Sequence, residues 1–284
     1  MTNDQVIVIG GGIAGLTSAS LLAHEGFEVT LLEAHSQTGG CAGTFRRGSY
    51  VFDVGATQVA GFEEGGIHER IFRFLDCPKP LAEILDPACI VQLADGSSPI
   101  KIWYDEELWA AERKEQFPGT ENFWSLCKQL HRSNWAFANR EPIVPVNNFW
   151  DLQQFLQALR PETIFSSLFT SFSVLDLLNF CSSHNDARLR RFLDLQLKLY
   201  SQEPLDRTAA LYGATVLHVA QNPLGLWHLE GSMQALSESL QACFVRDKGN
   251  LLLRHKVVGL GIGRNDRWEV QVIDSKGTVR TFIG

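Results

Sequence analysis

The sequence predicts an α/β fold, and three features of residues 6–33 lead to that prediction. Residues 6–9 are four β-branched residues in a row, which is typical of a buried parallel strand. A glycine-rich turn at 10–12 and a predicted helix over 13–25 follow directly. A second apolar run, 29–32, ends at the acidic residue Glu33. This order of strand, glycine turn, helix and strand predicts a Rossmann-like βαβ unit at the start of the chain.

The glycines of this turn predict a site for a dinucleotide. Gly10 permits the tight turn, Gly12 lets the backbone reach a pyrophosphate, and Gly15 lets the helix pack closely on the strand. The amides at the start of the helix then face the phosphates. Glu33 lies 23 residues after Gly10, where its carboxylate can accept hydrogen bonds from both ribose hydroxyls.

A second glycine cluster favours a flavin dinucleotide over NAD. Gly39, Gly40 and Gly43 follow the ribose-binding acid closely and would let the backbone approach an extended cofactor. Arg46 or Arg47 could face a phosphate. The alternative interpretation is an ordinary flexible loop with two solvated arginines.

Several stretches resemble one family of flavoproteins. Residues 33–44, with the pattern Glu-x5-Gly-Gly-x2-Gly-Thr, resemble the FAD-binding entry of flavin amine oxidases and of carotenoid (phytoene-type) desaturases and isomerases. Residues 52–68 are most similar to the cyanobacterial carotenoid 3',4'-desaturase branch. Residues 249–260 resemble the family's strand in which the backbone of a valine contacts the adenine of FAD. Residues 223–236 resemble a further family segment but carry Ser232 where its second glycine is usual.

This resemblance implies FAD as the cofactor and a glutathione-reductase-type FAD-binding domain. It implies cofactor contacts from Gly10, Gly12, Ile13, Ala14, Gly15, Glu33, Ala34, Gly39, Gly40, Gly43, Thr44 and Val257. No catalytic residue is assigned, because in flavin desaturation the protein mainly positions the substrate and excludes water. Gln58, His68 and Arg70 could approach the flavin ring, although a surface loop is the expected location of each.

The chain is expected to form a discontinuous FAD-binding domain, residues 1–80 and 222–284, around an inserted α+β substrate domain, residues 81–221. In the insertion, two strands at 90–96 and 99–104 are predicted around an Asp-Gly turn. Predicted helices follow at 121–137, with Thr120 as its N-cap, and at 149–159, 162–181 and 186–200. The returning segment predicts a helix at 232–243, a strand at 251–258, and a hairpin of strands 268–273 and 278–283.

The length of the chain suggests that part of the architecture is missing. Members of the family are much longer than 284 residues, and they end with a further strand and a Gly-Asp segment that holds the flavin end. Neither is found in this sequence. A missing C-terminal half is therefore an expected partner, and the chain alone is expected to be inactive and to retain flavin weakly.

Composition favours a cytoplasmic protein, with peripheral membrane association as a further possibility. A net charge of −7 argues against nucleic acid as a partner. The six cysteines form no Cys-x-x-Cys pair, so reduced thiols are expected rather than a disulfide framework. Neither the cysteines nor the eight histidines show metal-ligand spacing, so no metal site is predicted.

Apolar residues of the insertion have two interpretations. Those between Ile164 and Phe180 keep helical spacing in part, and tryptophans recur at positions 103, 109, 124, 135 and 150. The first interpretation is the core of a helical domain. The second is a wall for a long polyene, or a patch that dips into a membrane face. The uncharged stretch 163–175 is too short to span a bilayer of about 30 Å.

The favoured function is that of an FAD-dependent oxidoreductase of carotenoid desaturase type, which introduces a double bond into a lipophilic polyene. A carotene isomerase and a flavin amine oxidase relative have the same predicted fold and stay open as alternatives. A non-catalytic remnant of a split gene is the alternative outside the enzymes.

Overall fold

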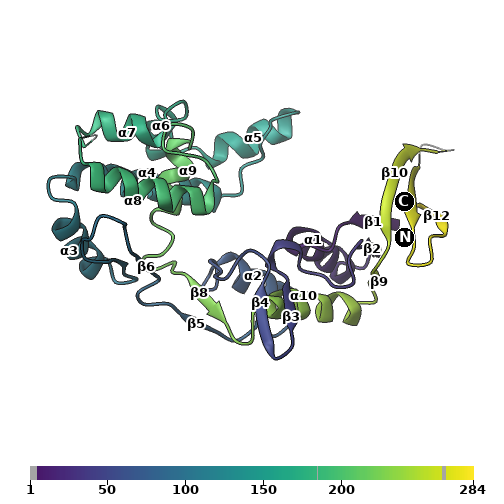
Figure 1. The fold of residues 1–284 in the computed structure, drawn as a ribbon. Coiled ribbons are helices and arrows are strands. Elements are labelled where there is room, and N and C mark those ends of the chain that lie inside the picture. The colour runs from purple at the N-terminus through teal and green to yellow at the C-terminus, as the bar shows by residue number, and fades with distance from the viewer. Residues whose placement is uncertain (1–4, 184, 264–266) are drawn as a thin grey trace. The chain divides into compact units, whose positions relative to one another are not determined.

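The computed structural model describes residues 5–183, 185–263 and 267–284, which form two compact units (Figure 1). Unit 1 combines Met1–Ile84 with Trp227–Gly284, and unit 2 is Leu85–Leu226. The domain boundaries expected from the sequence lay after residues 80 and 221. Unit 1 is an α/β structure that contains the predicted βαβ element, so the predicted fold class is confirmed.

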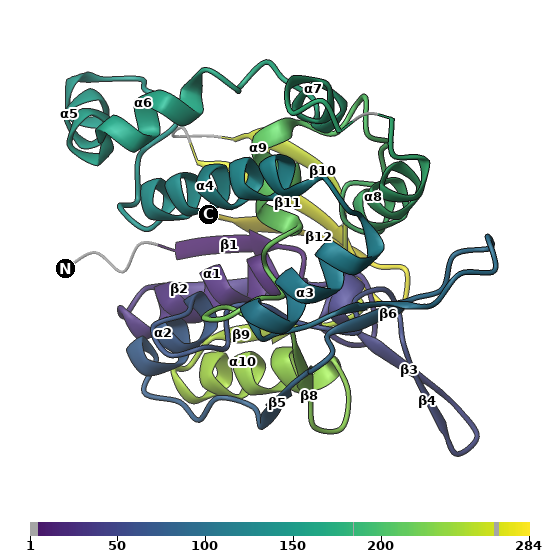
Figure 2. The same cartoon turned by 90° about the vertical axis from the view of Figure 1, so that its left-hand side faces the viewer.

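A parallel sheet forms the centre of unit 1. It consists of β1 (Gln5–Ile9), β2 (Glu28–Leu32) and β9 (Asn250–Leu252) in the order β1-β2-β9. Helix α1 (Ile13–His24) joins β1 to β2, and α10 (Gln234–Arg246) packs against α1 (Figure 2). Their shared core includes Leu16, Leu31, Leu240 and Phe244, each with no exposed surface. Burial of these side chains stabilises the contact between the two distant chain segments.

A second sheet in unit 1 is antiparallel. It comprises β10 (Lys256–Ile262), β11 (Trp268–Ile273) and β12 (Val279–Ile283), so the predicted C-terminal hairpin is confirmed. The single strand predicted at 251–258 is wrong, because β9 and β10 are separate strands. Arg254 between them adopts a positive φ of 58°, which turns the chain out of the parallel sheet.

The rest of unit 1 consists of short elements. These are the 3-10 helix η1 (Gly40–Ala42), the hairpin of β3 (Thr44–Arg47) and β4 (Tyr50–Asp53), helix α2 (Ile67–Phe74), and the ribbon of β5 (Ala82–Ile84) and β8 (Trp227–Leu229). Helix α2 was not predicted from the sequence.

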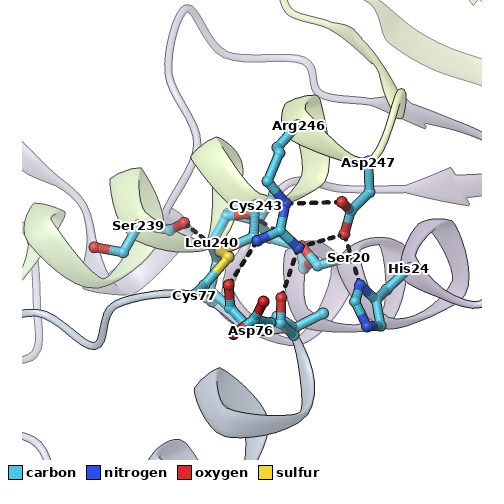
Figure 3. The surroundings of a disulfide bond; sticks show 11 residues. Ser20, His24, Asp76, Cys77, Ser239, Leu240, Cys243, Arg246 and Asp247 are labelled. Atoms are coloured by element: carbon cyan, nitrogen blue, oxygen red, sulfur yellow. Dashed lines mark hydrogen bonds and ion pairs between the residues drawn. A yellow bond between two sulfur atoms is a disulfide. The ribbon is translucent and has the colours of Figure 1, made fainter.

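The prediction that all six cysteines are reduced thiols is wrong for Cys77 and Cys243, which form a disulfide (Figure 3). Their Cα atoms lie 6.3 Å apart, within the usual range for a disulfide. Beside it, the Arg246 guanidinium donates to the carbonyls of Leu75 and Asp76 at the end of α2, at 2.6 and 2.7 Å. The fold therefore brings the end of α2 onto α10, a long-range contact that cysteine spacing does not encode. The other cysteines, Cys41, Cys89, Cys127 and Cys181, are free.

Unit 2 consists of a small hairpin followed by helices. Its elements are β6 (Cys89–Val91), β7 (Ile100–Ile102), α3 (Glu106–Gln116), α4 (Glu121–Ala138), α5 (Phe149–Ala158), α6 (Pro161–Ser167), α7 (Val174–Phe180), α8 (Ala187–Tyr200) and α9 (Ala210–Val216). The hairpin and the helices predicted at 121–137, 149–159 and 186–200 are confirmed. Thr120 is the N-cap residue of α4, but its hydroxyl donates to the Phe117 carbonyl instead of capping an α4 amide.

The single helix predicted at 162–181 is wrong, because the chain breaks between α6 and α7. The Phe172 carbonyl accepts from the Ala210 amide at 2.8 Å, and the Val174 amide donates to Thr208 at 2.9 Å. These hydrogen bonds to residues 208 and 210 take the place of the intrahelical hydrogen bonds that one continuous helix would form. Ser173 then starts α7 with a capping box to Asp176, a signal that was present in the sequence.

Aromatic side chains form one part of the core of unit 2. Trp109, Trp124, Phe117 and Phe192 are buried, and neighbouring rings lie 5.2–6.4 Å apart. For Trp109 and Trp124, two of the five tryptophans in question, the core interpretation is confirmed. Trp150, in contrast, is 60% exposed.

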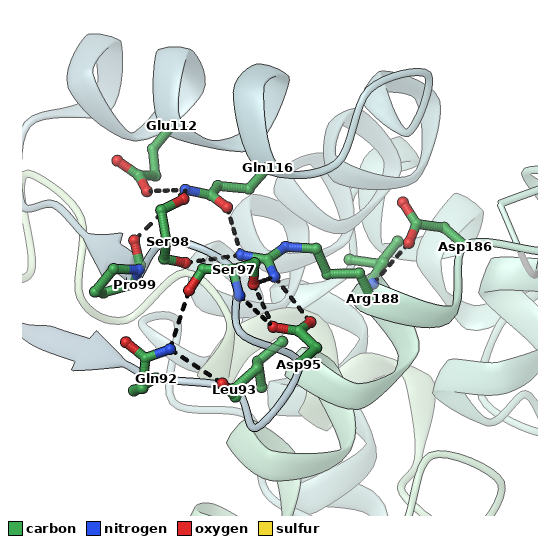
Figure 4. A network of polar contacts seen from close by, with 11 residues as sticks. Gln92, Leu93, Asp95, Ser97, Ser98, Pro99, Glu112, Gln116, Asp186 and Arg188 are labelled. Carbon is green, nitrogen blue, oxygen red and sulfur yellow. Dashed lines mark hydrogen bonds and ion pairs between the residues drawn. The ribbon is translucent and has the colours of Figure 1, made fainter.

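Arg188 of α8 connects three segments of unit 2 (Figure 4). Its guanidinium pairs with Asp95 at 2.9 Å, donates to the Ser98 carbonyl at 2.9 Å, and donates to the side chains of Ser97 and Gln116. Hydrogen bonds from Ser97 and from Arg188 hold the pKa of Asp95 at about 2, well below its usual value. The β6–β7 turn, α3 and α8 are thus held together around one cation.

Among the described residues, no helix is long and apolar enough to cross a membrane.

Candidate dinucleotide-binding site

The glycine turn lies at the carboxyl end of β1 and opens α1. The Gly10 amide donates to the Leu32 carbonyl at 2.8 Å, and Gly10 has a φ of 96° that other residues rarely adopt. A Cβ on Gly15 would lie 2.0 Å from the Gly10 carbonyl oxygen, so only glycine allows the helix to sit this close to the turn. A Cβ on Gly12 would meet nothing within 4 Å. The backbone is therefore tightly packed at Gly15 and open at Gly12, which is the side a pyrophosphate would approach.

The start of α1 provides donors for an anion. Gly12 is the N-cap residue, it supplies no side-chain cap, and the first turn carries no acidic residue. The amides of a first helical turn, here including Ile13 and Ala14, have no carbonyl partner within the helix. With the helix dipole, they favour a phosphate at this position.

Glu33 is held firmly at the end of β2. Its carboxylate accepts from the amides of Gly11 and His35, both at 2.6 Å. Its backbone amide donates to Leu252 at 2.9 Å, and its carbonyl accepts from His255 at 2.8 Å. The carboxylate thus lies beside the glycine turn, as ribose recognition requires, and Ala34 next to it is exposed.

The second glycine cluster lies directly against the first. The Gly39 amide donates to the Gly11 carbonyl at 2.8 Å, and Gly39 forms a parallel bridge with Gly12. A Cβ on Gly40 would lie 3.3 Å from the Gly12 Cα. Two stretches almost 30 residues apart in the chain (Gly11 and Gly39) therefore meet at one place, through backbone alone.

A network from α10 fixes the loop that carries the second cluster. The Gln234 side chain accepts from the Thr44 amide at 3.1 Å and donates to the Thr38 carbonyl at 3.1 Å and to Ser237 at 2.9 Å. The Thr44 hydroxyl donates to Asp53 at 3.0 Å. Sequence reasoning missed Gln234 and Asp53 as positioning residues, although both lie within the segments that carry the family resemblance.

The remaining predicted residues are dispersed around this centre. Val257 lies on β10, in an apolar cluster with Leu32, the residue before Glu33. Gly43 begins the turn into β3, and its amide donates to Gly40 at 3.0 Å. Arg46 lines a groove of about 590 Å³ between the 36–46 loop and α10. Arg47 lies over the Phe45 ring, 5.9 Å from its centroid.

The segment after β4 differs from its prediction. His68 and Arg70 lie on α2, so a surface loop is wrong for both, whereas Gln58 lies in an irregular stretch. The His68 ring packs 5.1 Å from that of Phe62, and burial lowers the pKa of His68. Burial raises the pKa of the neighbouring Glu63 carboxyl. These shifts follow from packing.

Comparisons with known proteins agree with this geometry. A family profile described as "NAD(P)-binding Rossmann-like domain" matches residues 8–77. All-trans-retinol 13,14-reductase of Danio rerio is 25% identical over 89% of this chain and 42% of its own length. The 4,4'-diapolycopene oxygenase of Methylomonas is 28% identical over 84% of this chain and 46% of its own. A prolycopene isomerase of an Oncidium cultivar is 34% identical over 45% and 23%. The predicted resemblance to carotenoid-modifying proteins is confirmed, and the chain spans less than half of each of these relatives.

Solved structures support the fold. Putrescine oxidase superposes with a TM-score of 0.59 at 16% identity, over 95% of this chain and 54% of its own. A fatty acid isomerase of P. acnes superposes with a TM-score of 0.57 at 13% identity, over 99% and 57%. At such identities the likeness establishes the fold alone.

Proposed function

We propose that this chain, a homologue of enzymes that modify retinoids and carotenoids, contains the nucleotide-binding unit of an FAD-dependent oxidoreductase, namely unit 1. One observation carries the cofactor assignment: the two glycine clusters meet at Gly12, where the backbone is open. A plain NAD site needs only the first cluster, whereas an extended flavin dinucleotide passes both. Bound FAD would supply the redox chemistry.

Each part of the site has a role in this proposal. The first-turn amides of α1 bind the pyrophosphate, and Glu33 accepts from the ribose hydroxyls. Gly39 and Gly40 allow the cofactor to continue past the turn. The chain's own contribution is to bind and orient the nucleotide end.

For the substrate we propose a lipophilic polyene. Three relatives are named for retinol, diapolycopene and prolycopene, which are all isoprenoid polyenes. Desaturation is the favoured reaction, and isomerisation is the second candidate because prolycopene isomerase is among these relatives. Amine oxidation has the weaker support of a fold shared with putrescine oxidase.

Flavin fluorescence titration tests the cofactor. We expect the chain to bind FAD in preference to NAD, and Gly12→Val to abolish binding because its side chain fills the pyrophosphate position. Gly261→Val is the matched control, since a Cβ there also meets nothing within 4 Å. Preferential binding of NAD, or full FAD binding by Gly12→Val, would contradict the proposal.

Pigment analysis tests the reaction. The chain would be expressed alone, and together with the C-terminal half of a relative, in cells that accumulate an acyclic carotenoid. A red-shifted product supports desaturation, and altered cis/trans content at unchanged conjugation supports isomerisation. Peroxide release from an amine, with no change of pigment, would reject the polyene substrate.

A further inference from the structure

Strands β3 and β4 of unit 1, with the turn between them, form the β3–β4 ribbon, residues 44–53. Arg47 pairs with Tyr50 across the ribbon, so Gly48 and Ser49 form a two-residue loop at its tip. Gly48 has a φ of 61°, a conformation that such a tight loop requires at its first position. Ser49 is exposed, and Figure 2 shows the ribbon extending beyond the helices of unit 1. The Ser49 hydroxyl is therefore accessible to another protein.

Two arginines precede Ser49 at fixed distances. Arg46 and Arg47 lie three and two residues before it, and an aromatic residue follows it directly. Ser49 alone among the serines and threonines of the chain has arginine at both of these positions. Protein kinases recognise a short stretch around the acceptor hydroxyl, and the pattern of charges in that stretch decides much of their choice of substrate. Two arginines in this arrangement therefore match a kinase whose substrate groove is acidic.

The charges along the ribbon favour such a partner at its tip. Arg46 and Arg47 are exposed, and they carry the only formal charges between residues 42 and 52. The acidic side chains around the ribbon lie at its base, namely Asp53, Glu230 and Glu238. Arg47 contacts the exposed Phe45 ring, 5.9 Å from its centroid, which leaves the guanidinium open to a further partner. The tip is therefore positive on a chain whose net charge is −7.

The ribbon is also able to open locally, so that its tip fits an extended substrate groove. Strands β3 and β4 form a two-stranded sheet, and such a sheet is only marginally stable by itself. The stacked rings of Phe45 and Phe52, with centroids 5.3 Å apart, hold its middle. The last pair before the turn, Arg47 and Tyr50, is exposed on both strands. The turn can therefore open while the core of unit 1 stays folded.

We propose that Ser49 is a phosphorylation site for a serine/threonine protein kinase that selects arginine at these two positions. The kinase transfers the γ-phosphoryl group of ATP. A bond forms between the Ser49 Oγ and phosphorus, the bond from phosphorus to the β,γ-bridging oxygen breaks, ADP leaves, and the hydroxyl proton passes to the kinase's catalytic base. The product carries about two negative charges beside the guanidinium groups of Arg46 and Arg47, which donate charge-assisted hydrogen bonds to phosphate. This proposal is independent of the cofactor and the substrate proposed above.

Phosphorylation of the full chain in vitro tests the proposal. The probe is the catalytic subunit of cAMP-dependent protein kinase, a kinase that selects arginine three and two residues before serine, with ATP and Mg²⁺. Mass spectrometry should find phosphate at Ser49, and Ser49→Ala should abolish it. The double variant Arg46→Ala/Arg47→Ala should lower the initial rate by roughly tenfold or more, because two charge-assisted contacts with the kinase are lost.

The chain offers two matched controls. Ser275 lies in the exposed β11–β12 turn of the same unit without an arginine before it, and it should stay unmodified. Arg190→Ala/Arg191→Ala removes the other exposed pair of arginines and should leave the rate at Ser49 unchanged. Circular dichroism should show all variants folded, because the substituted side chains are exposed.

A synthetic peptide of residues 42–53 is the reference for an open turn. The folded chain should be phosphorylated at a rate within roughly tenfold of the peptide's, because a marginally stable ribbon opens often. A slower rate would overturn the proposal, since it would show that the folded chain withholds Ser49. Equal modification of Ser49 and Ser275, or an unchanged rate in Arg46→Ala/Arg47→Ala, would also overturn it, because exposure rather than the two arginines would then determine the site.

Discussion

Unit 1 and unit 2 are assembled in opposite ways. Unit 2 is one continuous stretch whose helices pack around buried side chains, among them leucines and aromatic rings. Unit 1 combines two stretches that lie on either side of unit 2 in the sequence, and its candidate site is built mostly from backbone. From this difference we expect the stability of unit 1 to depend on the space around its glycines and on contacts between its two stretches. The stability of unit 2 should depend on its buried side chains.

The largest expected effect comes from a side chain placed at Gly15, where the backbone of unit 1 leaves no room for one. Gly15→Ala would place a Cβ 2.0 Å from the Gly10 carbonyl, and neither the turn nor α1 can move without disrupting β1. We expect a loss of about 4 kcal/mol or more in the stability of unit 1, measured by hydrogen exchange of its peptides. Gly12→Ala in the same turn is the control and should fold normally, because its Cβ meets nothing within 4 Å. Equal stability of the two variants would refute the close packing.

The next effect concerns the covalent link between the two stretches of unit 1. Cys77→Ser should destabilise this unit by about 2–4 kcal/mol, because the Cys77–Cys243 bond restricts the unfolded chain. Cys41→Ser, which removes an exposed free thiol of the same unit, should change stability by less than about 0.5 kcal/mol. Urea unfolding with and without reductant provides the measurement. If reductant leaves wild-type stability unchanged, the link is not a determinant of unit 1.

For unit 2 we expect a loss of stability at acidic pH, caused by two of its buried histidines. Burial lowers the pKa of His218 to about 3 and that of His131 to about 4, and their rings stack 5.7 Å apart. In the unfolded chain both titrate near 6.5. Below pH 6.5 the unfolded state thus binds more protons than the folded state, so stability falls as pH drops toward these lowered values.

This loss should be roughly 2 kcal/mol at pH 5 for His218 alone. Urea unfolding at several pH values, followed by tryptophan fluorescence, measures it, because unit 2 holds five of the seven tryptophans. His218→Leu should flatten the slope of stability against pH by about one proton. His228→Leu, at an exposed position of unit 1, should leave the slope unchanged. Identical slopes for wild type and His218→Leu would reject this origin of acid sensitivity.

Local signals allowed much of unit 1 to be predicted from the sequence. The β-branched run, the glycine turn and Glu33 located β1, α1 and β2, and the structure brings both glycine clusters together. The turn at Arg254 that separates β9 from β10 could not be predicted, because it depends on a hydrogen bond to a distant segment, from the Arg254 amide to the His35 carbonyl.

Distant contacts also explain other features that sequence reasoning missed. Cys77 and Cys243 carry no signal of pairing, since they are 166 residues apart. The role of Gln234 arises only when α10 returns to the 37–44 loop. For Ser173 and Asp176, in contrast, the capping signal was in the sequence and should have divided the predicted helix.

The smallest expected effect tests whether the second stretch of unit 1 supports the cofactor loop of the first. Gln234→Leu removes the acceptor of the Thr44 amide and the donor to the Thr38 carbonyl. Leaving these partly buried groups unpaired should cost about 1 kcal/mol, so the Thr44 amide should exchange about five times faster. Glu238→Leu, exposed on the same helix, is the control. If FAD affinity falls several-fold for Gln234→Leu but not for Glu238→Leu, α10 positions the second glycine cluster through this one amide. If exchange at Thr44 is unchanged, the loop holds its conformation without the Gln234 side chain.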